Sequence, residues 1–294
     1  MKDFRKSFIG EMIERFVDHD IVGAGAQMAY YILLFIFPLL IFIIAILGYL
    51  NLPADDAIYF ISLVAPREAI SFFGKYIEYI LTEKQANLLL VSLFATFWTA
   101  SNALRVLINS LNKAYGVEEK RSYIKRKILA IPFTLLITLC IAAALFIPIL
   151  GKNLLLWASN FIYISAILIQ YLKYLRWLMA VFTIFNVMLV IYFIAPNMRM
   201  RLLSIVPGAA LATAAWILMS TLFSLYFSVF RGYAVVYGSI GALIILMIWM
   251  LWSSIVIIAG GELNALLEDR RYAKQHTTGK KKRSKLITKQ KLNI

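Results

Sequence analysis

Six polar or charged side chains interrupt the apolar stretches of this chain near one end of its predicted helices, where they could bind a charged group. They are Gln27, Asn102, Arg105, Asn109, Glu262 and Asn264. Because Asn102 and Arg105 are three residues apart, they share one face of a helix, which Asn109 continues. A charge inside an apolar segment costs free energy to hold, so such residues mark functional sites or internal ion pairs. We expect Arg105 to pair with Glu262, and Asn102 and Asn264 to hydrogen-bond to the pair.

Two interpretations of this cluster are open at the level of sequence. In the first, the six residues line a polar cavity that faces the cytoplasm and binds a charged headgroup or an ion. In the second, Arg105 and Glu262 form a buried ion pair that fixes the register of two helices, while the long Arg105 side chain extends its charge toward water.

The residue patterns of enzymes and metal centres are missing from the sequence. The two histidines, His19 and His276, lie outside the predicted spans, and Cys140 is the single cysteine. There is no H-E-x-x-H motif, no phosphate-binding P-loop and no Cys/His set with metal-ligand spacing. Glu262 is the one acid associated with the predicted spans, so a carboxylate pair for acid–base catalysis is lacking. We therefore expect no enzymatic activity, no metal and no cofactor.

Composition predicts the elements that carry these residues. Apolar residues make up 62% of the 294 residues, against roughly 45–50% in soluble domains, and the mean hydropathy is +0.80. A spanning helix needs roughly 20 apolar residues, and seven uncharged stretches approach that length. We predict an all-α, multi-pass bundle of six transmembrane helices with interfacial outer helices. The spans are expected at residues 23–50, 86–109, 128–150, 177–196, 207–230 and 239–261.

The positions of Lys and Arg decide the number of spans and their orientation. Basic residues are dense at 113–127 and in the tail 268–294. With six spans and both termini in the cytoplasm, most of the 30 Lys and Arg residues lie inside, as the positive-inside rule requires. A seventh span at 153–172 would place the basic tail outside. We therefore interpret 153–172 as interfacial, and its partial insertion stays open.

Two segments flank the predicted six-helix domain at 23–267. Residues 1–22 carry Phe4, Phe8, Met12 (or Ile13) and Phe16 at helical spacing with charges on the other face. This pattern is typical of an amphipathic helix on the membrane surface, or of a solvated helix packed on protein. The tail 268–294 is predicted to be cytoplasmic and disordered. Because the net charge is +15, we expect the basic loop and the tail to contact anionic lipid headgroups rather than a specific nucleic acid.

Small residues, one proline and two tyrosines are predicted to shape the bundle. Pro38 lies in the middle of the first predicted span, which it should kink. Small residues let helices approach closely. We expect such close approaches at Gly25, Gly208, Gly238 and Gly241. The predicted outer connection 231–242 carries Tyr233 and Tyr237, which either serve a function there or only anchor a tight turn at the interface.

The sequence resembles the YihY/BrkB family of bacterial inner-membrane proteins over residues 4–269. The resemblance rests on three blocks: GAQMAYY at 25–31 with FPL at 37–39; WTAS at 98–101 through NKAYGV at 112–117; and PGA at 207–209, YGSIGA at 237–242 and GGELNA at 260–265. It implies a bacterial inner-membrane location and a part in envelope integrity, serum resistance or lipid-precursor export. An older "ribonuclease BN" label also attaches to the family, and the residues of this chain do not support it.

Two functions follow as hypotheses. The first is a transporter or flippase of an amphipathic envelope molecule, such as a lipid or a lipid-linked precursor, with a polar cavity facing the cytoplasm. The second is a scaffold or assembly factor for envelope integrity that transports nothing. A cavity at membrane depth favours the first hypothesis, and a closed bundle favours the second. Neither the substrate nor the oligomeric state follows from the sequence.

Overall fold

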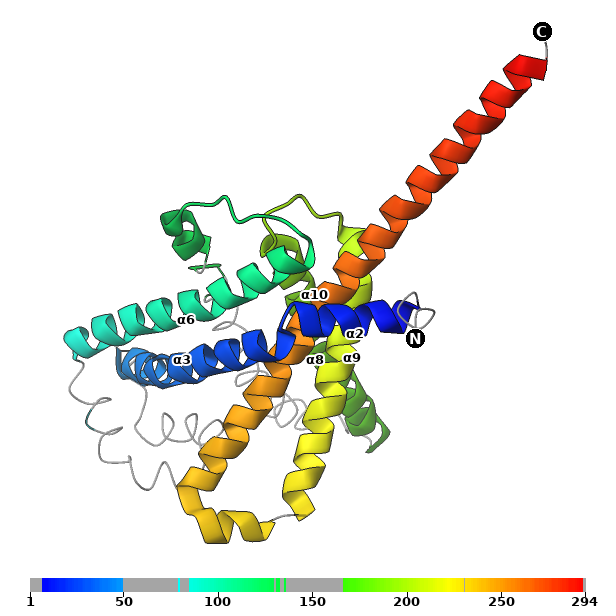
Figure 1. The fold of residues 1–294 in the computed structure, drawn as a ribbon. Coiled ribbons are helices and arrows are strands. Elements are labelled where there is room, and N and C mark those ends of the chain that lie inside the picture. The colour runs from blue at the N-terminus through cyan, green and yellow to red at the C-terminus, as the bar shows by residue number, and fades with distance from the viewer. Residues whose placement is uncertain are drawn as a thin grey trace. The chain divides into compact units, whose positions relative to one another are not determined.

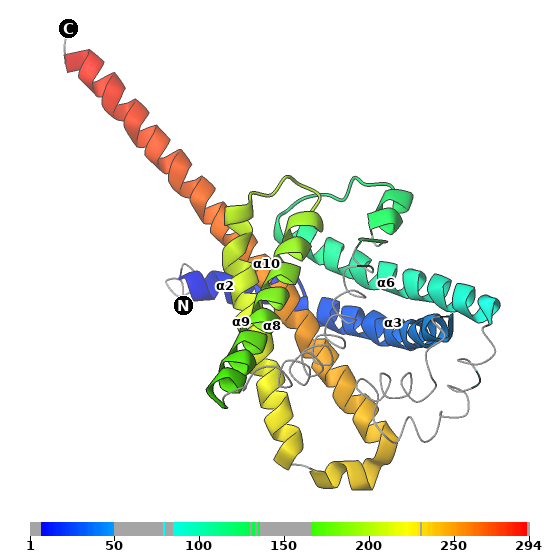
Figure 2. The same ribbon diagram turned by 180° about the vertical axis from the view of Figure 1, so that it is seen from behind.

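The computed structural model describes residues 7–49, 79, 85–129, 131, 132, 135, 166–229 and 231–292, and in these the chain forms helices joined by turns and no strand. The labelled helices are α2 (Phe8–Asp18), α3 (Ile21–Tyr49), α6 (Ala86–Ala114), α8 (Ala166–Ile194), α9 (Leu202–Val229) and α10 (Arg231–Leu292), shown in Figures 1 and 2. The predicted all-α class is confirmed.

Five stretches in the described residues are long and apolar enough to cross a membrane: Ile21–Ile46, Ala86–Ala114, Trp177–Ile194, Leu202–Leu225 and Leu243–Ala273. They overlap with five of the six predicted spans, and the multi-pass architecture is confirmed. The remaining predicted span, 128–150, lies mostly outside the described residues. So do residues 51–84, which join the first two predicted spans on the predicted outer side, and most of 153–172. Helix α8 begins at Ala166, so the end of that last segment continues into the span that follows it.

The chain divides into two compact units. One comprises Met1–Ala26, Leu107–Lys120 and Ile184–Ile294, and the other comprises Gln27–Val106 and Arg121–Thr183. In the second unit, the Lys127 ammonium lies 3.3 Å from the centre of the Trp98 ring, a cation–π contact. Pro38 lies inside α3, which continues through it to Tyr49.

Helices α9 and α10 pack against each other in the first unit along a seam of small and polar residues. From one end of α9 to the other, Ser204 contacts Arg271, Gly208 contacts Asn264, Trp216 contacts Ser253 and Ser220 contacts Trp249. The partners on α10 descend as those on α9 ascend, so the two helices are antiparallel. The contacts on α9 recur at roughly every fourth residue, which places them on one helix face.

Two glycines bring these helices close together. A Cβ atom added to Gly208 would meet the backbone oxygen of Gly260 and the side chain of Asn264, and one added to Gly260 would meet the Tyr192 hydroxyl and, at 2.8 Å, the Gly208 oxygen. Interfaces of membrane helices are rich in small residues because packing, rather than hydrophobic burial, holds such helices together. Gly25 lies against α10 in the same way, since a Cβ there would be 2.6 Å from Cγ1 of Ile255.

Helix α10 differs from the prediction at both of its ends. It begins at Arg231 rather than 239, so Tyr233, Tyr237 and Gly238 belong to a helix and not to a loop, and it continues to Leu292 through the tail that was predicted to be disordered (Figure 1). Residues 231–292 contain no proline, and the tail beyond 262 has a single glycine among many Lys, Arg, Leu and Gln residues. The high net charge of the tail suggests disorder. However, these residue types have good helix propensity, which explains why the helix continues into the tail.

Candidate functional site

The carboxylate of Glu262 is fully buried, at 0% exposure, and two basic side chains, His19 and Arg15, face it. Nδ1 of His19 lies 2.5 Å from Oε1, within hydrogen-bond distance. Nη1 of Arg15 lies 3.8 Å from Oε2, which has no hydrogen-bond partner among the described residues. A buried carboxylate is costly unless it is paired, so these two side chains are what stabilise its charge.

The sequence around α2 explains how both side chains reach Glu262. The hydroxyl of Ser7 accepts a hydrogen bond from the Gly10 amide at 3.0 Å and caps the start of α2. Arg15 and His19 are four residues apart and therefore share a face. After α2 ends at Asp18, the chain turns at Asp20, which has φ of 50°, and α3 begins at Ile21. Asp tolerates this left-handed backbone better than most residues, which permits the tight turn.

Arg15 also joins α2 to two further elements. Its guanidinium lies 2.5 Å from Oδ2 of Asp269 on α10 and donates to the carbonyl oxygen of Ala114 at 3.2 Å. Ala114 is the last residue of α6, where Gly116 at φ of 61° closes the helix with the Gly116 amide on the Lys113 carbonyl. A cation at a helix C-terminus is favoured by the helix dipole, so Arg15 caps α6 while pairing with α10.

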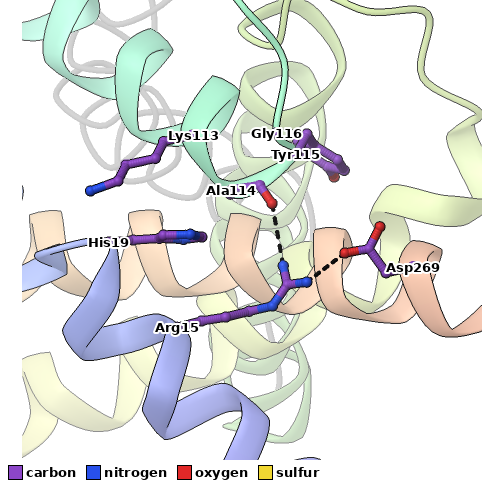
Figure 3. A pocket seen from close by; sticks show the side chains of 7 residues that line it. All are labelled: Arg15, His19, Lys113, Ala114, Tyr115, Gly116 and Asp269. Atoms are coloured by element: carbon purple, nitrogen blue, oxygen red, sulfur yellow. Dashed lines mark hydrogen bonds and ion pairs between the residues drawn. The ribbon is translucent and has the colours of Figure 1, made fainter.

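These side chains surround a polar pocket of about 330 Å³ in the first unit (Figure 3). It is lined by Arg15, His19, Lys113, Ala114, Tyr115, Gly116 and Asp269. The ammonium of Lys113 donates to the backbone carbonyl of Asp18 at 3.2 Å. The pocket therefore combines two permanent cations, an imidazole, a phenol and a carboxylate, and it can hold a charged polar group but presents little apolar surface.

Tyr115 lines the pocket, and its hydroxyl is buried without a hydrogen-bond partner among the described residues. Burial raises the pKa of Tyr115, and the negative charge of the neighbouring Glu268 raises it further. Both effects disfavour the phenolate, so the hydroxyl stays protonated at neutral pH and remains a potential hydrogen-bond donor.

Asn264 lies two residues beyond Glu262 on α10 but points elsewhere, because two residues turn a helix by about 200°. Its Oδ1 accepts a hydrogen bond from the Gly208 amide at 2.7 Å, and its buried Nδ2 has no partner among the described residues. Pro207, just before Gly208, cannot donate a backbone hydrogen bond and disturbs the turn around it. Asn264 thus holds α9 to α10.

The six residues singled out in the sequence are divided between the two units. Gln27, Asn102 and Arg105 belong to the second unit, whereas Asn109, Glu262 and Asn264 belong to the first. All six are described, and none of them lines the pocket, although Glu262 adjoins it through Arg15 and His19. The pairing of Arg105 with Glu262 stays a prediction, and Glu262 has partners without it.

Sequence reasoning missed the residues that line the pocket. Arg15 and His19 were assigned only to the charged face of an amphipathic segment, and Lys113 only to a basic loop. The available signal was the four-residue spacing of Arg15 and His19 on one face, together with a lone acid in a facing apolar helix. Among the described residues, no group of three or more His, Cys, Asp and Glu side chains is placed to hold a metal ion.

Comparison with known proteins places the chain among bacterial relatives. The family described as Virulence factor BrkB matches residues 12–285. The putative ribonuclease-like protein YfkH of Bacillus subtilis is 38% identical over 265 residues, which cover 90% of this chain and 96% of that protein. A UPF0761 membrane protein of Chromohalobacter salexigens is 38% identical over 89 residues, covering 30% of this chain and 22% of the relative. The UPF0761 membrane protein PSHAa0171 of Pseudoalteromonas translucida is 35% identical over 79 residues, covering 27% of this chain and 26% of the relative. No solved structure matches the chain significantly.

Proposed function

Because the chain belongs to the BrkB family and is a multi-pass membrane protein, we propose that it binds and moves an amphipathic envelope molecule, a lipid or a lipid-linked precursor. One observation carries the proposal. A fully buried carboxylate, Glu262, lies in a helix long and apolar enough to span the membrane, and both of its partners line an open polar pocket. Ionisable groups in such helices are costly and are retained chiefly at substrate or ion pathways.

The size and charge of the pocket suit the polar end of such a molecule. Ligand pockets span roughly 300–1,000 Å³, so a pocket of about 330 Å³ is large enough for a headgroup but not for a whole lipid. The acyl chains would stay in the bilayer. Arg15 is neutralised by Asp269, whereas Lys113 donates to an uncharged carbonyl and keeps two ammonium donors for a ligand. Lys113 therefore favours an anionic headgroup.

The proposed site faces the cytoplasm at the bacterial inner membrane. The pocket is built from α2, which follows the N-terminus, and from Lys113–Gly116, which opens the basic loop 113–127. Both segments are on the cytoplasmic side in the predicted topology, since basic loops are retained there. The transported molecule would thus enter from the leaflet in which the cell synthesises its lipids.

A scaffold for envelope integrity is the second candidate, and a different observation favours it. Arg15 and His19 already have carboxylate partners, Asp269 and Glu262. The whole cluster can then serve to clamp α2 to α10 and to the end of α6, and the protein would present surfaces to partners without moving a lipid.

Ribonuclease activity is not part of the proposal, although YfkH carries a ribonuclease-like name. Metal-dependent nucleases need clustered His and acidic ligands, and neither the sequence motifs nor the described residues supply such a cluster. Purified protein should leave transfer RNA intact with Mg²⁺, Mn²⁺ or Zn²⁺. Cleavage that disappears with a single substitution in this chain would contradict this.

The transport proposal is tested with reconstituted vesicles. The protein is placed in liposomes that contain a trace of fluorescent phosphatidylglycerol, and dithionite bleaches the outer leaflet. Wild-type vesicles should lose the protected fluorescence faster than protein-free vesicles, and Lys113→Gln should slow this loss. Lys125→Gln, which removes an exposed lysine of the same loop outside the pocket, is the matched control. No acceleration by the wild-type protein, or equal effects of the two substitutions, would favour the scaffold.

A further inference from the structure

Helix α2 has an inner face that ion pairs attach to α10. Glu11 pairs with Arg270 at 2.9 Å, Arg15 with Asp269 at 2.5 Å and His19 with Glu262 at 2.5 Å. Glu11, Arg15 and His19 are spaced by four residues, so they form one stripe along the helix. In Figure 1, α2 lies against α10 accordingly. The inner stripe fixes the rotation of α2 about its own axis.

The opposite face of α2 carries a second stripe with the same spacing. Ile9, Ile13 and Val17 are 64%, 51% and 70% exposed. Each lies two residues from a member of the inner stripe, a rotation of about 200°. Three neighbouring apolar side chains therefore point away from the rest of the first unit. Because the ion pairs hold the other face, α2 does not turn this stripe inward without breaking them.

Chain continuity identifies what covers the stripe. Only His19 and Asp20 separate the end of α2 from Ile21, where the apolar stretch Ile21–Ile46 begins. Three residue steps span at most about 11 Å, so the end of α2 lies within that distance of the start of a spanning helix. The start of a spanning helix is the boundary between lipid and water. Lys2, Arg5 and Lys6 precede α2 in the sequence and suit an anionic headgroup layer.

We propose that α2 lies in the membrane surface, with Ile9, Ile13 and Val17 inserted among the lipid chains and its charged face held by α10. The pocket residue Arg15 is on this helix and His19 is its C-cap, and the diameter of a helix is about 10–12 Å. The pocket therefore lies within one helix diameter of the lipid and at the level of the headgroups. This placement of α2 does not depend on whether the protein transports a lipid, so it is tested by a separate experiment.

The experiment measures the environment of single nitroxide labels. In a Cys140→Ser background, cysteine is introduced in turn at Ile9, Ile13 and Val17, and at the exposed controls Glu14 and Asp18 on the flank of the helix. The labelled proteins are reconstituted in vesicles of phosphatidylethanolamine and phosphatidylglycerol. Power saturation then compares collisions with oxygen, which concentrates in lipid, and with a water-soluble nickel chelate.

Labels at the three stripe positions should collide more with oxygen than with nickel, and labels at Glu14 and Asp18 should show the reverse. Nickel access at the stripe equal to that at the controls would mean a solvated helix and would overturn the proposal. Protection from both reagents would mean that protein, for example a second copy of the chain, covers the stripe, and would overturn it as well. Each label replaces an exposed side chain, and gel filtration against the unlabelled Cys140→Ser protein verifies the fold of each variant.

Discussion

Nδ1 of His19 lies 2.5 Å from Oε1 of Glu262, although the two residues are 243 positions apart in the sequence. This contact joins the N-terminal helix to the middle of the last helix. Through Arg15, the same cluster reaches Asp269 and the end of α6. Three segments that are distant in sequence therefore meet at one buried carboxylate.

Removing His19 should destabilise the protein because Glu262 would remain buried with only the more distant Arg15 as a partner. Breaking a buried pair by removing one member costs about 3–5 kcal/mol, and we expect the lower end of that range since Arg15 is retained. His19→Ala should lower the thermal unfolding midpoint in detergent, and adding Glu262→Gln should recover most of the loss. A double variant as unstable as His19→Ala alone would contradict the pairing.

Arg105 provides a contrast within the same double-mutant scheme. If Arg105 paired with Glu262, as the sequence suggested, Glu262→Gln would suppress the effect of Arg105→Ala. Because His19 and Arg15 already face the carboxylate, we expect the two substitutions to be additive within about 0.5 kcal/mol. The measurement is the same unfolding midpoint. If the coupling free energy between Arg105→Ala and Glu262→Gln were as large as that between His19→Ala and Glu262→Gln, it would support the predicted Arg105–Glu262 ion pair.

Gly208 should not tolerate a side chain. The Cβ of Gly208→Ala would meet the backbone oxygen of Gly260 and the side-chain amide of Asn264, which is hydrogen-bonded to the Gly208 amide. Overpacking of this kind costs about 1–3 kcal/mol, so the unfolding midpoint should fall. Ala214→Val, on an exposed face of α9, is the control and should change it little. Equal midpoints for both variants would show that α9 and α10 are not in close contact there.

Tyr115 separates ligand binding from stability. Its hydroxyl is buried with no partner among the described residues, which is unfavourable, so Tyr115→Phe should not lower the unfolding midpoint at neutral pH, while it should slow movement of phosphatidylglycerol in the vesicle assay. Loss of stability without loss of movement would assign the hydroxyl a structural partner instead.

The same substitution has a pH signature. Since the folded-state pKa of Tyr115 is raised above its ordinary value, the unfolded state loses this proton first as pH increases. The stability that Tyr115 contributes is therefore complete below a pH of about 10 and declines above it. Tyr115→Phe should unfold less readily than the wild-type protein in that alkaline range. Identical alkaline profiles would mean that Tyr115 is solvated.

The orientation of the chain is tested by labelling in intact cells. In a Cys140→Ser background, Lys285→Cys in the tail should not react with a membrane-impermeant maleimide, whereas Lys75→Cys in the predicted outer segment should react. The reason is that the basic tail is retained on the cytoplasmic side. Efficient labelling at 285 from outside would show that the tail is outside the cell. The predicted topology would then be wrong, and so would the proposal that the pocket faces the cytoplasm.

The class of the protein followed from the sequence because apolar length alone indicates a spanning helix. Five predicted spans recur in the described structure, with bounds that differ by up to twelve residues, since the last stretch ends at Ala273 rather than 261. Helix α8 itself begins at Ala166, eleven residues before the predicted span that it contains. The sequence predicts where the apolar stretch begins and ends. The helix itself continues into the neighbouring polar residues, so its bounds lie outside the predicted ones. The same reason explains why α10 starts at Arg231 and extends into the basic tail.

The candidate site was decided by tertiary structure. A lone acid in an apolar helix singled out Glu262 in the sequence, because a buried charge is expensive wherever the chain folds. Its partner was not predictable in the same way. Arg105, Arg15 and His19 all supply a suitable charge, and only the packing of α2 on α10 selects the last two for the first unit. Side-chain spacing within one helix defines a face, but which helix that face meets depends on the arrangement of the whole chain.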